Sequence, residues 1–291
     1  MAPKPLDALL EAAAGAVADA QGIVDTLRGV GIEGWDAEHI RHTLPWVRAV
    51  LGKYFRPDVR GLENIPPDGP ALLVGNHSGG IVIVDTFVFA CAFYEHFGPD
   101  RRFHQLAHDV AARMPFLGGL RRYGTVPASQ DNARAAFQVG APVLVYPGGD
   151  YETFRPSWQS DQIEFGGRQG FIRLALEEKV PIIPVVSVGG QETALFVTRG
   201  QRMAKLLRFD KLTRIKVLPI SIGPPFGVNI LDLPGRLPLP AKITIQVLPP
   251  IDLAEQFGAD PDPDLVYQHV TAQMQQALTS LQEERKLPII G

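Results

Sequence analysis

Short strand-like runs alternate with segments of helical periodicity through most of this chain. Aliphatic residues, many of them β-branched, dominate the runs, whereas apolar residues recur every three or four positions in the segments between them. This alternation is typical of βαβ units, in which helices cover a largely parallel sheet. The predicted strands are 71–75, 103–107, 142–146, 182–188, 215–220 and 242–248. One predicted helix begins after Asp85, and three others cover about 132–139, 168–178 and 264–285.

The pattern predicts a single α/β domain over residues 57–252, with a helical extension on each side. In the N-terminal extension, 1–56, apolar residues recur at helical spacing over 6–28 and again from about Pro45 to Phe55. The C-terminal extension, 253–291, holds an amphipathic helix that we expect to pack on the domain. The Pro- and Gly-rich stretch 223–240 is predicted to be mostly loop.

The composition excludes several classes of protein. A chain of 291 residues with 45% hydrophobic content can bury a core, so disorder is not expected. The net charge of −3 and the pI near 6.2 give no overall attraction to nucleic acid or to an anionic membrane. A single cysteine, Cys91, excludes a disulfide framework and a cysteine-rich zinc site.

Neither a secretory signal nor a transmembrane span is expected. The N-terminus has no basic region ahead of an apolar core. The apolar run around Ile81 to Phe93 is broken by Asp85 and is shorter than the roughly 18 residues that a span needs. The sequence therefore predicts a protein that stays inside the cell and touches a membrane without crossing it.

The strongest chemical signal is the segment NHSGGIVIVD, residues 76–85, which follows a predicted buried strand and precedes a predicted helix. Active-site residues favour such strand ends. We expect His77 to face a cleft as a general base, with the Asp85 carboxylate holding the neutral imidazole in one tautomer. The alternative interpretation is structural, with Asp85 as a helix cap and His77 as a turn residue.

Four segments in this order resemble the blocks of the glycerolipid acyltransferase superfamily, over about residues 57–252. They are the Asn-His…Asp segment, FLGGLRRYGTVPAS (116–129), VYPGGDYETFRP (145–156) and VPIIPVVSVGGQET (180–193). The resemblance implies an O-acyltransferase of phospholipid biosynthesis and lipid metabolism. It implies direct attack of a glycerolipid hydroxyl, activated by His77, on an acyl-CoA or acyl-carrier thioester, with Gly-rich backbone stabilising the oxyanion. No metal or redox cofactor is implied.

Two departures from the superfamily pattern concern the dyad and the acceptor. Seven residues separate His77 from Asp85 here, where four are usual. The third block reads Pro-Gly-Gly where phosphate-acceptor members read Glu-Gly-Thr, which is closer to the monoacylglycerol acyltransferase branch.

Arginines in or beside these blocks nevertheless favour 1-acylglycerol-3-phosphate as acceptor, because forked guanidinium groups suit phosphate. The alternatives are a neutral mono- or diacylglycerol acceptor and, in a different class, a non-catalytic lipid-binding protein. The predicted substrate-binding residues are Arg121, Arg122, Gly148, Gly149, Glu152, Arg155 and Arg168.

A basic stretch, 199–216, carries seven cations against the single Asp210 and suggests contact with anionic lipid head groups. A spacing of three residues winds round a helix, so only about three consecutive cations can share a face. Trp46 and Tyr54 give the predicted helix from about Pro45 to Phe55 an interfacial character. The sequence thus predicts peripheral attachment to the cytoplasmic face of a membrane through Trp46, Tyr54, Arg202, Lys205 and Arg208, with an ordinary solvated surface as the alternative.

Overall fold

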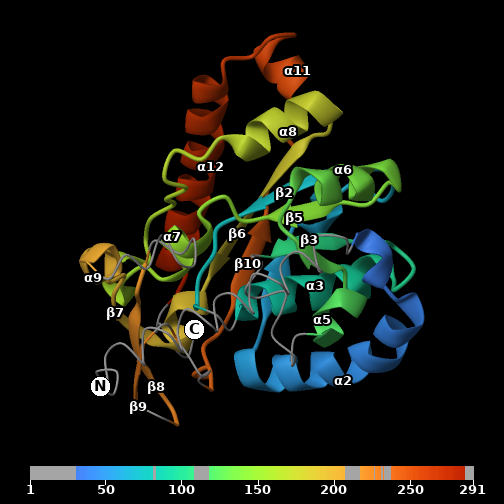
Figure 1. Ribbon diagram of the computed structural model, residues 1–291. Helices are drawn as coiled ribbons and strands as arrows, with labels where there is room; N and C mark the ends of the chain where they lie inside the picture. The colour runs from blue at the N-terminus through green and yellow to red at the C-terminus, as the bar shows by residue number, and fades with distance from the viewer. Residues whose placement is uncertain are drawn as a thin grey trace, which may run out of the picture.

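A seven-stranded sheet forms the centre of the computed structural model, which describes residues 31–80, 83–107, 118–206, 217–225, 227–230, 232 and 237–285 (Figure 1). The strand order is β1-β10-β6-β2-β5-β3-β4. The strands are β1 (Asp58–Arg60), β2 (Leu72–Gly75), β3 (His104–Ala107), β4 (Thr125–Pro127), β5 (Val143–Val145), β6 (Ile182–Val188) and β10 (Thr244–Val247).

Five neighbouring strands of this sheet run parallel, from β6 through β2, β5 and β3 to β4. β10 is antiparallel to β6, and β1 is parallel to β10, so these two strands run the other way. Every residue of β2, β5 and β6 is buried, as expected for strands covered on both faces. The predicted α/β fold with a largely parallel sheet is confirmed.

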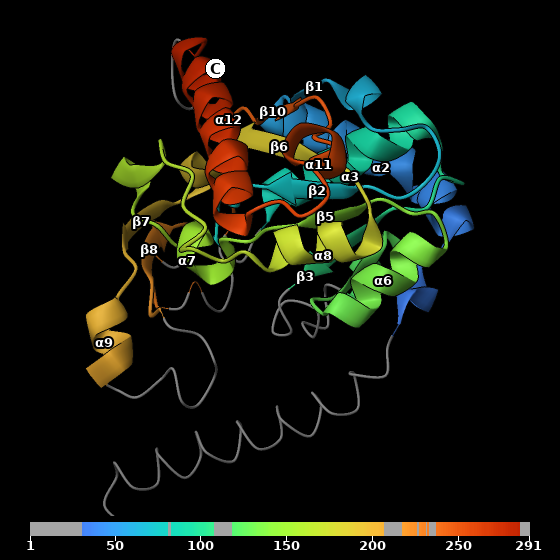
Figure 2. The same ribbon diagram turned by 90° about the horizontal axis from the view of Figure 1, so that it is seen from above.

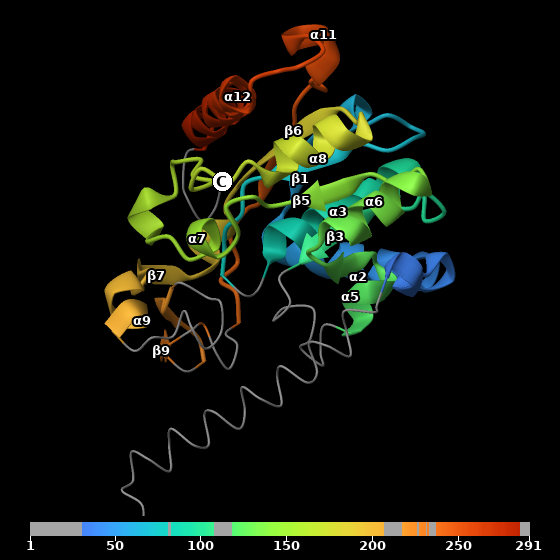
Figure 3. The ribbon, with the colours of Figure 1, turned by 45° about the horizontal axis from the view of Figure 1, so that its top comes forward.

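Helices cover both faces of the sheet (Figures 2 and 3). On one face, α2 (Ala37–Phe55) and α3 (Val84–Phe97) enclose a core with Leu73, Leu144 and Ile183. On the other face, α6 (Gln130–Gln138), α8 (Gly170–Glu178), α11 (Leu253–Phe257) and α12 (Pro263–Glu283) pack on Leu72, Val143 and Ile182. Alternate residues of one strand thus serve opposite cores. Shorter elements are η1 (Ile32–Gly34), η2 (Leu62–Asn64), α5 (Gly118–Arg122), α7 (Gly149–Thr153), η4 (Ser157–Gln159), η5 (Gly190–Thr193) and α9 (Gln201–Leu206).

Two predicted boundaries differ from the structure. α2 begins at Ala37 rather than near Pro45, because the Asp36 carboxylate caps the helix by accepting a 3.0 Å hydrogen bond from the amide of His39. The strand predicted over 215–220 begins at Ile220, where that prediction ended. The predicted helix over 6–28 lies outside the described residues.

A second, three-stranded antiparallel sheet is formed by β7 (Leu195–Thr198), β8 (Ile220–Gly223) and β9 (Gly227–Ile230), in that order. β9 lies inside the stretch 223–240 that was predicted to be mostly loop. Pairing explains the difference, because Ile220, Ser221 and Ile222 align with Ile230, Asn229 and Val228 across the hairpin. Among the described residues, no helix combines the length and apolar character that crossing a membrane requires.

Candidate active site

His77 and Asp85 come together at the carboxyl edge of the parallel strands, where α/β folds place their functional residues. β2 ends at Gly75, so His77 lies on the loop just after it, and Asp85 lies in the first turn of α3. The His77 Nδ1 atom is 3.4 Å from the Asp85 Oδ2 atom, with the side chains 12% and 1% exposed. The longer spacing in the sequence therefore still brings the imidazole and the carboxylate together.

The contact between His77 and Asp85 is not yet a hydrogen bond. At 3.4 Å it exceeds the usual N–H···O range of about 2.7–3.2 Å, and the buried Nδ1 atom has no hydrogen-bond partner among the described residues. The Asp85 carboxylate instead accepts the backbone N–H groups of Ser78, at 3.2 Å, and Thr86, at 2.8 Å. Asp85 thus satisfies part of the structural interpretation, although Ile83 occupies the N-cap position.

Two glycines make the longer loop possible. Gly79 and Gly80 have φ of 91° and 72°, a region that favours glycine. A Cβ atom on Gly79 would lie 2.8 Å from the Gly190 carbonyl oxygen, and one on Gly80 would lie 2.2 Å from the Asp232 carboxylate. The loop therefore turns tightly against its neighbours, which brings the chain back to Asp85.

Tyr146, directly after β5, supports the imidazole ring. The rings of His77 and Tyr146 stack with centroids 4.3 Å apart and an interplanar angle of 23°. Thr86 donates a 2.8 Å hydrogen bond to the Tyr146 hydroxyl oxygen. Burial raises the pKa of the Tyr146 hydroxyl well above its usual value, and the nearby Asp85 charge adds to the shift. Tyr146 therefore stays protonated and cannot compete with His77 as a base.

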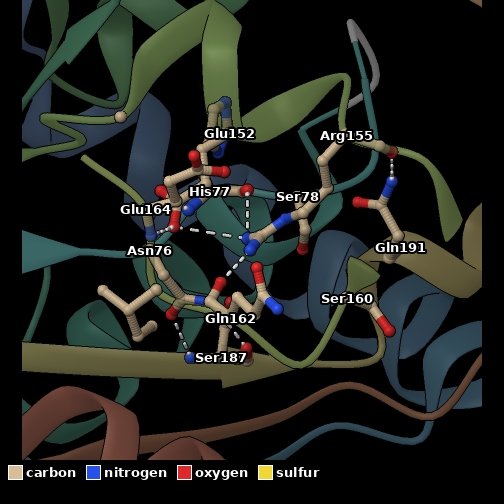
Figure 4. Close-up of polar contacts among 12 residues, drawn as sticks. Asn76, His77, Ser78, Glu152, Arg155, Ser160, Gln162, Glu164, Ser187 and Gln191 are labelled. Carbon is tan, nitrogen blue, oxygen red and sulfur yellow. Dashed lines mark hydrogen bonds and ion pairs between the residues drawn. The ribbon is translucent and has the colours of Figure 1, made fainter. Parts of the chain in front are cut away.

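A buried ion pair holds the backbone of His77 at both ends (Figure 4). The Glu152 Oε2 atom accepts the His77 N–H at 3.0 Å, and the Arg155 Nη2 atom donates to the His77 carbonyl oxygen at 3.3 Å. The two side chains pair at 3.3 Å and are 0% and 2% exposed. Burial raises the pKa of Glu152, whereas Arg155 and the accepted N–H groups lower it in part. These two residues, predicted to bind substrate, contact the peptide of His77.

Two further side chains brace the site, and sequence reasoning did not assign them a role. The Asn76 side chain bonds both backbone groups of Ser187 on β6, donating at 2.9 Å and accepting at 2.7 Å. Gln191 donates to the Arg155 carbonyl oxygen and accepts the Gly79 N–H at 3.4 Å. The signals were present as the Asn that precedes His77 and the Gly-Gly-Gln that follows β6.

Arg168 closes the loop that follows β5. Its guanidinium group donates to the carbonyl oxygens of Pro147, at 3.1 Å, and Gly148, at 2.7 Å, and pairs with Asp150 at 3.0 Å. Gly148 is buried, and a Cβ atom there would lie 2.5 Å from Glu152 Oε2, while Gly149 adopts φ of 49°. The predicted residues of the third block thus do meet near His77, through contacts with one another.

The structure does not bring Arg121 and Arg122 to the site. Both end α5, immediately before β4, and β4 runs parallel to its neighbours. They consequently lie at the amino edge of the strands, opposite His77. There the Arg122 carbonyl oxygen accepts the Asp36 N–H, and its side chain contacts His39.

The predicted membrane residues fall on two elements. Trp46 and Tyr54 lie on α2, 70% and 40% exposed, and the Tyr54 hydroxyl donates to the Pro238 carbonyl oxygen at 2.7 Å. Lys205 is exposed on α9, and Arg202 lies on the same helix. Arg208 lies outside the described residues.

Comparisons with known proteins concern the family and the fold. Residues 56–188 match the Acyltransferase family. An uncharacterized protein of Mycobacterium tuberculosis is 28% identical over 80% of this chain, which spans only 63% of that relative's length. The human 2-acylglycerol O-acyltransferase 3 is 26% identical over 87% of this chain and 74% of its own.

Two more comparisons concern a storage-lipid enzyme and a solved structure. The Bos taurus DGAT1/2-independent enzyme synthesizing storage lipids is 30% identical over 66% of this chain and 55% of its own. The crystal structure of the 1-acyl-sn-glycerophosphate acyltransferase PlsC of Thermotoga maritima aligns with a TM-score of 0.52 at 16% identity, covering 84% of this chain and 82% of that one. This last likeness supports the fold.

Proposed function

Because this chain belongs to the glycerolipid acyltransferase superfamily, we propose that it transfers a fatty acyl group from a thioester to the hydroxyl group of a glycerolipid. The observation that carries the proposal is the placement of His77 Nδ1 3.4 Å from Asp85 Oδ2 at the carboxyl edge of the sheet. Catalytic hydrogen bonds are often long in the free enzyme and tighten when substrate binds. A contraction of a few tenths of an ångström would complete this one.

In the proposed reaction, His77 acts as the general base through Nε2. Its Nδ1 atom faces Asp85 and is closed to solvent, so the exposed 12% of the side chain lies elsewhere on the ring. Nε2 takes the proton of the acceptor hydroxyl as the oxygen adds to the thioester carbonyl. The tetrahedral intermediate then collapses, the C–S bond breaks, and the imidazolium returns the proton to the leaving thiolate. Asp85 stabilises the transient imidazolium.

For the acceptor, we propose a neutral mono- or diacylglycerol rather than 1-acylglycerol-3-phosphate, which the sequence favoured. A buried phosphate needs cations whose hydrogen bonds are not already used. Arg155 is committed to Glu152 and to backbone carbonyls, and Arg168 to two carbonyls and Asp150. Arg121 and Arg122 lie at the far edge of the sheet. Each arginine that led to the prediction of a phosphate acceptor is therefore either bonded to other groups of the protein or far from His77.

The names of two relatives point to the same acceptor class. One is a 2-acylglycerol O-acyltransferase and the other synthesizes storage lipids. We further propose that the protein attaches peripherally to the cytoplasmic face of a membrane, where its acceptor resides, with acyl-CoA or an acyl-carrier thioester as donor and no metal or redox cofactor. Trp46, Val50 and Tyr54 support this attachment, because at intervals of four they form an exposed apolar stripe along α2.

The experiment is an acyl-transfer assay with purified protein, labelled acyl-CoA and a panel of acceptors that includes monoacylglycerol, diacylglycerol and 1-acylglycerol-3-phosphate. We expect product with the neutral acceptors and its loss in His77→Ala. Transfer that prefers the phosphate acceptor would overturn the acceptor proposal. A second candidate function is a non-catalytic lipid-binding protein, which the lack of a hydrogen bond at His77 Nδ1 favours. Lipid binding without transfer to any acceptor would favour that candidate.

A further inference from the structure

The small sheet has one buried face and one aliphatic face that is exposed. Side chains alternate between the two faces of a strand. Phe196, Ser221 and Asn229, which pair across the three strands, are all buried. The row beside them, Leu195, Ile222 and Val228, also pairs across the strands and is 39% to 65% exposed. Val197 and Ile230 extend the exposed face, and the strands carry no charged residue.

An exposed aliphatic face of this kind is unusual on a soluble monomer, because water contact with contiguous apolar surface is unfavourable. The polar residues Ser221 and Asn229 are on the inner face, where Ser221 donates a 2.8 Å hydrogen bond to Asp232, and only Thr198 pairs within the outer row. Folding alone would have favoured the reverse arrangement, with polar residues outside. The outer face therefore needs an occupant.

We propose that the outer face of β7, β8 and β9 enters the surface of a lipid bilayer. Charge complementarity supports this occupant. Arg199, the first cation after β7, pairs with Glu164 at 2.8 Å. The rest of the connection between β7 and β8 contains six cations against the single acid Asp210, namely Arg202, Lys205, Arg208, Lys211, Arg214 and Lys216. A cationic connection between two strands of an aliphatic face suits anionic head groups above an acyl layer, and each cation near such a surface contributes about 1 kcal/mol.

The position of the sheet relative to His77 supports the same occupant. Phe196, on the inner face, lies where a Cβ atom on Gly80 would be 2.6 Å from its ring, so the sheet packs directly on the loop that carries His77. The inference rests here on the proposed function, since a lipid acceptor must leave the bilayer close to the base. A bilayer against this sheet would present the acceptor beside the active-site loop.

A short segment, 237–240, links the sheet to α2, because the Leu237 N–H donates to the carbonyl oxygen of Pro224, directly after β8, at 2.9 Å. The Tyr54 hydroxyl is bonded to Pro238, and the neighbouring Leu237 is 62% exposed. α2 and the ends of β8 and β9 both lie towards the bottom of Figure 1. The Trp46, Val50 and Tyr54 stripe and the sheet are therefore connected through this segment, and we expect both to contact the same bilayer.

The test is co-sedimentation of the full chain with vesicles of phosphatidylcholine, with and without phosphatidylglycerol. We expect Val228→Asp combined with Ile230→Asp to weaken binding to both vesicle types by about tenfold or more, because two aliphatic side chains no longer enter the bilayer. Loss on neutral vesicles separates this effect from charge repulsion. The matched control is Val139→Asp with Leu265→Asp, which alters exposed aliphatic residues directly after α6 and on α12, towards the top of Figure 1, and should bind as wild type.

Unchanged binding of the β9 double variant, or equal loss in the control, would overturn the proposal. A second measurement tests the proposal if the aspartate substitutions prevent folding. An environment-sensitive dye attached through Val228→Cys, in a Cys91→Ala background, should shift its emission to the blue when vesicles are added, whereas the same dye attached through Leu265→Cys should not. Absence of a shift at position 228 would contradict bilayer entry.

A second copy of the chain is the competing occupant. A dimer of the wild-type protein that the β9 double variant converts to a monomer, with vesicle binding intact, would assign the face to self-association and overturn the proposal. Vesicle binding is measured without an acyl donor. Its result is therefore independent of whether His77→Ala abolishes acyl transfer, and the two proposals fail separately.

Discussion

The backbone N–H of His77 donates a 3.0 Å hydrogen bond to the buried carboxylate of Glu152. Because the partner of Glu152, Arg155, bonds the carbonyl oxygen of the same residue, one ion pair fixes the position of the peptide that carries the proposed base. The arrangement gives Glu152 a positioning role. Such a residue should affect turnover through geometry, without touching the acceptor.

Replacing Glu152 with Gln should lower both stability and turnover. The amide oxygen can still accept the His77 N–H, but Arg155 is left as a buried charge without its partner, which typically costs about 3–5 kcal/mol. We expect kcat to fall about tenfold or more, while KM for the acceptor changes little, since misplaced catalytic groups affect the transition state most. Denaturant unfolding and steady-state kinetics measure the two effects.

The matched control for Glu152 is Glu177→Gln, which removes an exposed carboxylate paired with Arg134 at 2.6 Å. Exposed pairs of this kind contribute about 0–1 kcal/mol, so neither stability nor kcat should change much. A rise in acceptor KM at constant kcat in Glu152→Gln would contradict the positioning role and return Glu152 to the substrate-binding residues.

Replacing His77 with Ala should reduce kcat about 10²- to 10⁴-fold, the usual contribution of a general base. The fold should survive, because the side chain contributes mainly a stacking contact with Tyr146. Asp85→Asn should also be severe but should retain more activity. His96→Ala, at an exposed histidine near the end of α3, serves as the control. Wild-type kcat in a folded His77→Ala protein would rule out the dyad.

The nearness of His77 and Asp85 was predictable because it depends on local order, a strand followed by a loop and a helix. The ion pair that holds the His77 peptide was not predictable, since Glu152 and Arg155 reach this peptide from the end of a different strand. Nothing in the spacing of the third block distinguishes an arginine that binds substrate from one buried against a carboxylate. Sequence reasoning therefore found the residues of this block and could not find what they contact.

Arg121 and Arg122 illustrate a second limit. A sequence shows that they precede a strand, but which edge of the sheet they occupy depends on the direction of that strand among its neighbours. The small sheet shows a third limit. β9 is four residues long within a Pro- and Gly-rich stretch, and its strand conformation depends on pairing with β8 rather than on its own pattern.

Replacing Arg168 with Gln tests the neutral acceptor. The change removes hydrogen bonds to the carbonyl oxygens of Pro147 and Gly148 and the ion pair with Asp150, so the loop after β5 should loosen. We expect kcat/KM to fall by the same factor for monoacylglycerol and for 1-acylglycerol-3-phosphate. An additional loss of about 10- to 150-fold confined to the phosphate acceptor, which corresponds to about 1.5–3 kcal/mol, would instead identify Arg168 as a phosphate ligand.

Stability should fall in mild acid because of His104, on β3. This side chain is fully buried, its Nδ1 atom lies 3.1 Å from the Gly124 carbonyl oxygen, and burial lowers the pKa of the imidazole from 6.5 to about 4. The unfolded chain therefore takes up this proton at a higher pH than the folded protein. The resulting stability is fully present above about pH 6.5 and is lost as the pH falls towards 4, by at most about 3 kcal/mol.

The variant His104→Asn isolates this effect, because its side-chain amide can keep the hydrogen bond to Gly124 but does not titrate. It should be less stable than wild type at pH 7, since the smaller side chain leaves a cavity, and its free energy of unfolding should change less between pH 6.5 and 4. His96→Asn removes an exposed histidine and should leave the wild-type pH dependence in place. Urea unfolding at a series of pH values gives the three curves. Parallel curves for wild type and His104→Asn would show that another group accounts for the loss of stability in acid.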